Sequence, residues 1–169
     1  MHTSLVMTVL GPDRPGLVRI LSEAVASHGG NWLESRMARL AGQFAGVVRV
    51  ECSADAVENL IAALDAFSSE GLSVHTVREA LPPKEIRRTL SVDVVGNDRP
   101  GIVRELAAAI ANSGGNIEEL TTGLESAPMS GHPMFRAHGV ISVPENTETS
   151  AITVAIESLG GDLTVDVSL

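Results

Sequence analysis

Aromatic residues and cysteine are nearly absent from this chain. Its 169 residues include no tyrosine, one tryptophan and three phenylalanines. Because sequence-tolerant binding of single-stranded nucleic acid depends on aromatic side chains that stack on bases, this composition provides no such platform. The single cysteine, Cys52, excludes an intramolecular disulfide and is typical of a reducing compartment. We therefore expect a cytoplasmic protein.

Basic residues and long apolar runs are also scarce. Twelve Lys and Arg stand against 21 Asp and Glu, which gives a net charge of −9. A phosphate backbone is repelled by such a surface at long range, so direct nucleic-acid binding is disfavoured. No apolar run approaches the roughly 20 residues that a membrane span needs, and residues 5–10 are too short for a signal segment. The sequence predicts no membrane contact.

Motifs for catalysis, cofactors and metals are missing as well. The sequence shows no nucleophile elbow, no Walker phosphate loop and no recognisable acid–base pair. His132 and His138 have no cysteine or cluster of carboxylates close in sequence, so they do not predict a zinc site. We expect a protein that is not an enzyme, with no catalytic residue, no metal and no cofactor.

What the chain does contain is an internal duplication. Residues 11–18, Gly-Pro-Asp-Arg-Pro-Gly-Leu-Val, recur 85 positions later as Gly-Asn-Asp-Arg-Pro-Gly-Ile-Val at 96–103. At the same offset, the Gly-Gly-Asn of residues 29–31 recurs at 114–116. Two copies in one alignment predict a single structural unit used twice.

The second copy differs from the first by an insertion. The offset grows from 85 to 91, because Phe44 corresponds to Phe135. The six extra residues fall between about Gly123 and Met134, in a segment with Pro, Gly and Met. This loop is either a neutral surface excursion or an adaptable contact for a partner.

The first copy has the pattern β-α-β-β-α-β. After a strand at 5–10, apolar residues at 17, 20, 21, 24 and 25 predict one face of a helix, with Pro15 in its first turn and Gly29-Gly30 at its end. Strands at 31–40 and 43–52 follow, joined by a tight turn at Ala41-Gly42. A helix with apolar residues 57, 60, 61 and 64 and a strand at 72–78 complete the unit.

The second copy repeats this order, with strands at 90–95, 116–125 and 163–169. We therefore predict an α+β fold of two ferredoxin-like βαββαβ units, each an antiparallel four-stranded sheet with its helices on one face. The predicted domains are 1–81 and 89–169, and the Pro-rich and charged segment 82–88 is the predicted linker.

The repeated Asp-Arg-Pro-Gly turn is the candidate binding site. It lies where a strand ends and a helix begins, and the first N–H groups of a helix favour an anion. The aspartate either caps the helix or receives the ammonium group of a small zwitterion whose carboxylate lies on the helix N-terminus. We expect the asparagine that begins the next strand to lie beside this turn. The candidate ligand-binding residues are Gly11, Asp13, Gly16 and Asn31 in the first copy, and Gly96, Asp98, Gly101 and Asn116 in the second.

These motifs resemble the ACT domain, a regulatory module, over nearly all of both halves. The resemblance rests on Asp-Arg-Pro-Gly after a strand, an amphipathic helix, and Gly-Gly-Asn whose asparagine follows Pro15 by sixteen residues. Residues 30–44 are similar to the tandem ACT group typified by a glycine-cleavage-system transcriptional repressor. The resemblance implies that a small effector, usually an amino acid, binds between two ACT units. It assigns contacts to Asp13 with Asn31 and to Asp98 with Asn116, although serine-binding members often have Asn at the aspartate position.

Our prediction is a non-enzymatic regulatory module that binds an amino acid at these turns. It would signal to a protein partner through the packing of its domains or of two subunits in a homodimer. Regulation of transcription would then act through a separate DNA-binding protein. The alternative is a ligand-free scaffold that pairs through its sheets, with the aspartates serving only as helix caps.

Overall fold

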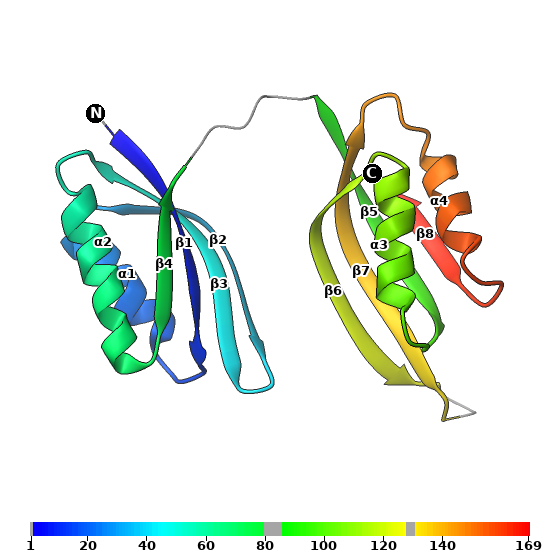
Figure 1. The fold of residues 1–169 in the computed structure, drawn as a ribbon, viewed down its shortest axis with the longest axis horizontal. Helices are drawn as coiled ribbons and strands as arrows, with labels where there is room; N and C mark the ends of the chain where they lie inside the picture. Colours follow the sequence, from blue (N-terminus) through cyan, green and yellow to red (C-terminus); the bar gives the residue numbers. More distant parts are fainter. Residues whose placement is uncertain (1, 80–85, 128–130) are drawn as a thin grey trace. The chain divides into compact units, whose positions relative to one another are not determined.

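The computed structural model describes residues 2–79, 86–127 and 131–169 and divides the chain into two compact units, 1–82 and 83–169 (Figure 1). The elements of the first unit are β1 (His2–Pro12), α1 (Leu17–Ser27), β2 (Asn31–Leu40), β3 (Gln43–Ser53), α2 (Val57–Asp65), the 3-10 helix η1 (Ala66–Glu70) and β4 (Ser73–Arg78). Those of the second are β5 (Arg87–Asn97), α3 (Ile102–Asn112), β6 (Asn116–Ser126), β7 (Pro133–Pro144), α4 (Thr149–Glu157) and β8 (Thr164–Ser168).

Each unit contains one four-stranded sheet in which every neighbouring pair of strands is antiparallel. The strand orders are β2-β3-β1-β4 and β6-β7-β5-β8, so both units have the same topology. The two helices of each unit lie on one face of its sheet (Figure 1). The predicted α+β fold of two βαββαβ units is confirmed.

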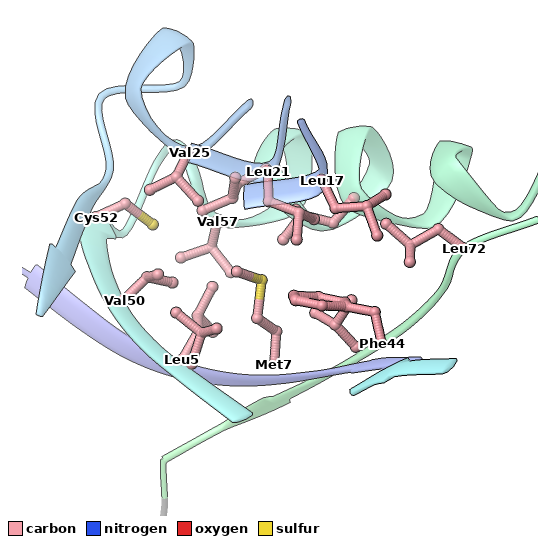
Figure 2. Packing of buried hydrophobic residues seen from close by; sticks show 14 residues of the cluster. Leu5, Met7, Leu17, Leu21, Val25, Phe44, Val50, Cys52, Val57 and Leu72 are labelled. Carbon is pink, nitrogen blue, oxygen red and sulfur yellow. The ribbon is translucent and has the colours of Figure 1, made fainter. Parts of the chain in front are cut away.

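Alternating apolar residues build the core of the first unit. Leu5, Met7 and Val9 of β1 are at most 1% exposed, because their side chains face the helices. Figure 2 shows the side chains of the sheet and those of the helices meeting in one layer. Burial of each large apolar side chain contributes about 1.5–3 kcal/mol. The helical contribution to this core comes from Leu17, Leu21, Val25, Val57, Leu60 and Leu64.

The second unit has a matching core of its own. Its buried residues from the sheet and the two helices are Leu90, Val92, Val94, Ile102, Leu106, Ile110, Phe135, Ala137, Ile141, Val143, Ile152 and Ile156. Ile102, Leu106 and Ile110 lie four residues apart along α3, which places them on one face of the helix. Each unit therefore buries an apolar layer between its own sheet and its own helices.

Both ends of α1 depend on glycines. The helix begins at Leu17, and its N-cap is Gly16 in the left-handed region with φ 89°. Pro15 thus precedes the helix, and its predicted place in the first helical turn is wrong. At the other end the N–H of Gly30 donates to the carbonyl oxygen of Val25, and Gly29 has φ 69°, as in a Schellman motif.

The second unit begins earlier than the predicted linker allows. Strand β5 starts at Arg87, so Arg87 and Arg88 are sheet residues and not part of the linker predicted at 82–88. Their guanidinium groups hold loops of the second unit: Arg87 donates to the carbonyl oxygen of Gly114, and Arg88 donates to that of Thr147. Most of the remaining linker segment, residues 82–85, lies outside the described residues.

The insertion lengthens the second hairpin in two ways. Glu125 pairs with Met134, as Leu40 pairs with Gln43, and one additional pair follows between Ser126 and Pro133. Residues 127–132 then connect β6 and β7, where residues 41–42 alone connect β2 and β3. Residues 128–130 lie outside the described residues, so the contact with a partner considered for this loop stays a prediction.

Candidate effector-binding turns

The first Asp-Arg-Pro-Gly turn lies beside the hairpin between β2 and β3. The N–H of Asp13 donates to the carbonyl oxygen of Gly42 at 2.8 Å. Its carboxylate Oδ2 lies 2.7 Å from Nε of Arg39, a residue near the end of β2. The neighbouring Arg14 forms an ion pair of 2.9 Å with Glu70 of η1. Main-chain and side-chain contacts thus fix this turn against two other segments of the unit.

The aspartates of the two turns do not cap the helices. The N-cap residues are Gly16 and Gly101, and neither α1 nor α3 has a side-chain hydrogen bond at its N-cap. The first helical hydrogen bond of α1 runs from the N–H of Ile20 to the carbonyl oxygen of Gly16. The N–H groups before Ile20 have no carbonyl of the preceding turn to reach, so they can donate to an anion. The capping interpretation of Asp13 and Asp98 is therefore wrong.

Gly16 and Gly101 present exposed backbone at these helix starts. A Cβ on Gly16 would meet nothing closer than Nε of Arg19 at 4.0 Å, and one on Gly101 nothing closer than Nη2 of Arg104 at 3.6 Å. The glycines are needed for their positive φ, since L side chains rarely adopt that conformation. The open space leaves the backbone accessible to a small molecule.

Gly11 and Gly96 lie in a different environment. Both are buried. A Cβ on Gly11 would lie 2.8 Å from the carbonyl oxygen of Gly71, and one on Gly96 would overlap Cδ2 of Leu163. The close approach of the chain before β4 and before β8 thus accounts for glycine at these positions. Their contact with a ligand stays a prediction.

The two asparagines lie far from the turns of their own units. Asn31 pairs with Glu51, whereas Gly11 pairs with Phe44, seven residues away along β3. At a strand rise of about 3.3 Å per residue the two positions are about 23 Å apart. The prediction that Asn31 lies beside the Asp13 turn is wrong, because α1 carries the chain back to the end where β1 begins.

Asn116 is displaced in the same way in the second unit. It pairs with Ser142, seven residues along β7 from Phe135, the partner of Gly96. Its side-chain Nδ2 donates to Oε1 of Glu118 at 2.8 Å, and the hydroxyl of Ser142 donates to the same oxygen. Hydrogen bonds from Ser142 and then Asn116 lower the pKa of Glu118. Asn116 therefore belongs to a polar cluster remote from the Asp98 turn.

The second turn has a different set of contacts. The N–H of Asp98 donates to the carbonyl oxygen of Pro133, again across to the hairpin. Arg99 donates to Glu105 at 2.6 Å and to the carbonyl oxygen of Leu159. The hydrogen bond from Arg99 lowers the pKa of the Glu105 carboxyl. The cation of this turn is thus directed toward α3 and the end of α4, and the Asp98 side chain is exposed.

The N–H of Asn97, next to this turn, donates to Oδ2 of Asp162 at 2.9 Å. That backbone hydrogen bond is the main reason why the pKa of Asp162 is lowered. Asp162 belongs to the segment before β8, which also packs against Gly96. The second turn is therefore fixed to this segment, much as the first turn is fixed to η1.

Arg39 is the residue at the site that sequence reasoning missed. The feature of the sequence that could have identified Arg39 is its position two residues before the Ala41-Gly42 turn. The register places Arg39 opposite Phe44, and Phe44 pairs with Gly11, two residues before Asp13. The two-residue turn fixes the register of β2 on β3, and the proximity of Arg39 to Asp13 requires the register of β1 on β3 in addition.

Two other properties of the described residues bear on function. Among residues 2–79, 86–127 and 131–169, no group of three or more His, Cys, Asp or Glu side chains is placed to hold a metal ion. In the same part of the chain, no helix has the length and hydropathy of a membrane span.

Residues 3–77 match the ACT domain family. The second unit repeats the same motif and the same strand order. The first unit is an ACT domain, and the chain has a tandem ACT fold. Its similarity to known proteins extends beyond the first unit. It is 25% identical over 169 residues to the glycine cleavage system transcriptional repressor of Escherichia coli (strain K12), a match that covers 98% of this chain and 88% of the relative.

A solved structure gives a further comparison. The crystal structure of an unknown protein from Galdieria sulphuraria matches this chain with a TM-score of 0.82 and 30% sequence identity. The match covers 99% of this chain and 98% of that one. The match to a protein of known structure thus includes the residues of both units.

Proposed function

We propose that this tandem ACT-domain protein is a non-enzymatic regulatory module that binds an amino acid at its Asp-Arg-Pro-Gly turns. The observation that carries the proposal is the geometry of each turn. Asp13 and Asp98 each lie three residues before an exposed glycine that is the N-cap of an 11-residue helix. The carboxylate offers a partner for an ammonium group, and the helix N-terminus offers N–H donors for a carboxylate, except that in α3 the N–H of Ile102 already donates to the carbonyl oxygen of Arg99.

A zwitterion therefore matches the charges of the turn. Hydrogen bonds between ionised groups are roughly twice as strong as neutral ones, so an amino acid can be held by few contacts. The failure of the capping interpretation supports this assignment, because neither aspartate side chain is used to cap its helix.

The response to an effector requires that binding favour one arrangement of the protein over another. Asp13 is a suitable position for such coupling, since its main chain and side chain both contact the β2–β3 hairpin. A ten- to hundredfold response corresponds to a coupling free energy of about 1.4–2.8 kcal/mol. A few charge-assisted hydrogen bonds at the turn are sufficient for this.

The asparagines can contact an effector at an Asp-Arg-Pro-Gly turn only if they belong to a second ACT unit. Since Asn31 lies at the far end of its own sheet, a small molecule at the Asp13 turn cannot reach it within that unit. We include in the proposal that the protein is a homodimer in which a second copy of the chain supplies the asparagine.

The readout of the proposed module is a protein partner. Its Escherichia coli relative is named as a transcriptional repressor, and the net charge of −9 of this chain opposes direct contact with DNA. We propose that it acts in the cytoplasm on a separate DNA-binding protein.

A thermal-shift screen of the whole protein against the twenty amino acids tests the proposal. A one-site ligand at 100 times its dissociation constant adds about 2.7 kcal/mol to stability, which raises Tm by several degrees. We expect a selective shift that is reduced in Asp13→Asn or Asp98→Asn. If no amino acid shifts Tm, the ligand-free scaffold becomes the better account.

A further inference from the structure

The two Asp-Arg-Pro-Gly turns differ in whether a cation contacts the aspartate. In the first unit Nε of Arg39 lies 2.7 Å from Oδ2 of Asp13. The Asp13 side chain is 28% exposed and that of Arg39 is 70% exposed, so the pair lies at the protein surface. In the second unit the equivalent residue is Leu124: Arg39 pairs with Phe44 in the hairpin, and Leu124 pairs with Phe135.

The Asp98 carboxylate has no such partner among the described residues. Arg104 lies beside Gly101 of this turn, with its Nη2 3.6 Å from where a Cβ on that glycine would be, but it forms no ion pair with Asp98. Two further arginines lie toward this end of the sheet, and each is engaged elsewhere. Arg99 donates to Glu105 and to the carbonyl oxygen of Leu159, and Arg136 lies 3.4 Å from Glu125. Among the described residues, the carboxylate of the second turn is exposed and forms no ion pair, unlike that of the first.

We propose that Arg39 is an internal competitor for the ammonium group of an effector at the first turn. The inference rests on the proposed function, because it assumes that the aspartates receive an ammonium group. At the first turn that group must displace the guanidinium of Arg39 or share the carboxylate with it. At the second turn the side chain at the same position, Leu124, offers no charge, so the ammonium group meets a carboxylate that is not held in an ion pair.

The size of the effect follows from the exposure of the pair. Exposed ion pairs of this kind weaken a competing interaction by a factor of about two to five. The second turn therefore fills at a lower effector concentration than the first, and the protein responds in two steps. Arg39 and Leu124 are the residues that determine this order.

Exchange of these two residues tests the inference. The whole protein, labelled with 15N, is titrated separately with each of the twenty amino acids, and the amide resonances of the N-cap residues Gly16 and Gly101 report the two turns. We expect Gly101 to respond at the lower concentration in the unmodified protein. Arg39→Leu lowers the midpoint at Gly16 by about two- to fivefold and leaves Gly101 unchanged. Leu124→Arg raises the midpoint at Gly101 by a similar factor and leaves Gly16 unchanged.

Three outcomes contradict the account, and they separate its parts. If an amino acid binds and Arg39→Leu leaves the midpoint at Gly16 unchanged or raises it, Arg39 is not a competitor, although the proposed function survives. The same conclusion follows if Gly16 has a lower midpoint than Gly101 in the unmodified protein. If no amino acid moves either resonance in the unmodified protein or in either variant, the proposed function itself is wrong. Both residues are exposed, and unchanged spectra elsewhere confirm that the variants fold.

Discussion

Asp13 and Asn31 lie at opposite ends of the same sheet, although the resemblance to other ACT domains assigns both to one ligand. Gly11 of β1 pairs with Phe44, and Asn31 pairs with Glu51 at the other end of β3. An effector that touches both kinds of residue must therefore bridge two units. If the second unit belongs to another copy of the chain, effector binding and self-association are thermodynamically linked.

This linkage gives the first prediction. We expect the effector to lower the dissociation constant of the homodimer, and to do so less in Asn31→Ala, because a bound molecule that contacts both copies stabilises their association. Sedimentation velocity at a series of protein concentrations, with and without the effector, measures the change. Equal dissociation constants with and without the effector would contradict the proposal that the effector binds between two copies of a homodimer.

Gly11 is expected to be important for folding. A Cβ at this position would lie 2.8 Å from the carbonyl oxygen of Gly71 and 3.0 Å from Cδ1 of Leu72. We predict that Gly11→Ala lowers the free energy of unfolding by about 1–3 kcal/mol, as overpacking does elsewhere. Gly123→Ala is the matched control, since a Cβ there meets nothing within 4 Å, and its effect should stay within about 1 kcal/mol. Urea denaturation of both variants measures their free energies of unfolding. Equal values would contradict the prediction and show that the backbone before β4 moves easily to make room for the added Cβ.

Asp13→Asn is expected to change stability very little. The helix start has no side-chain cap to lose, and the ion pair with Arg39 is largely exposed. We predict a change of less than about 1 kcal/mol in the free energy of unfolding. Urea denaturation without ligand provides the measurement. A larger loss would mean that reduced effector binding in this variant cannot be separated from damage to the fold.

Glu118 predicts how stability depends on pH. Hydrogen bonds from Ser142 and Asn116 lower its pKa from the usual 4.5. A lowered pKa in the folded state means that the carboxylate contributes stability above pH 4.5, and that this contribution is lost as the pH falls through the folded pKa. We predict that Ser142→Ala raises the pKa of Glu118. The decline of the free energy of unfolding below pH 4.5 then becomes shallower.

Denaturation curves at several acidic pH values measure this decline, with Glu118→Gln as the control. In the Glu118→Gln background, Ser142→Ala should have no further effect on the slope. If the slope changes as much with glutamine at position 118 as with glutamate, the pH dependence attributed to this hydrogen bond has another source.

Local patterns in the sequence predicted most of the fold. The turn at Ala41-Gly42 is confirmed, and both residues have positive φ. Strand β2 has the predicted bounds, Asn31–Leu40, because a double glycine precedes it and a tight turn follows it. The duplication then carries the same assignment to the second unit. The position of Pro15 could not be predicted as well, because proline before a helix and proline in its first turn give nearly the same sequence signal.

The candidate site was harder to predict because it depends on contacts between segments distant in the chain. Asn31 is near Asp13 along the sequence but not in space. The antiparallel return of α1 separates them, and the strand order already implies this result. The ion pair between Arg39 and Asp13 requires the register of β1 on β3 and of β3 on β2 together. The difference between Arg39 and Leu124 becomes meaningful only when both registers are known.

The most direct test of the central claim is isothermal titration calorimetry with the amino acid selected by the thermal screen. It is titrated into three proteins: the unmodified chain, a double variant with Asp13→Asn and Asp98→Asn, and Asn59→Asp as a control on α2. If the turns hold the ammonium group, binding is measurable in the unmodified chain and in the control, and at least tenfold weaker in the double variant, as expected when a charge-assisted hydrogen bond of about 1.5–3 kcal/mol is lost. Equal affinity in all three proteins would show that the effector binds elsewhere and would contradict the account.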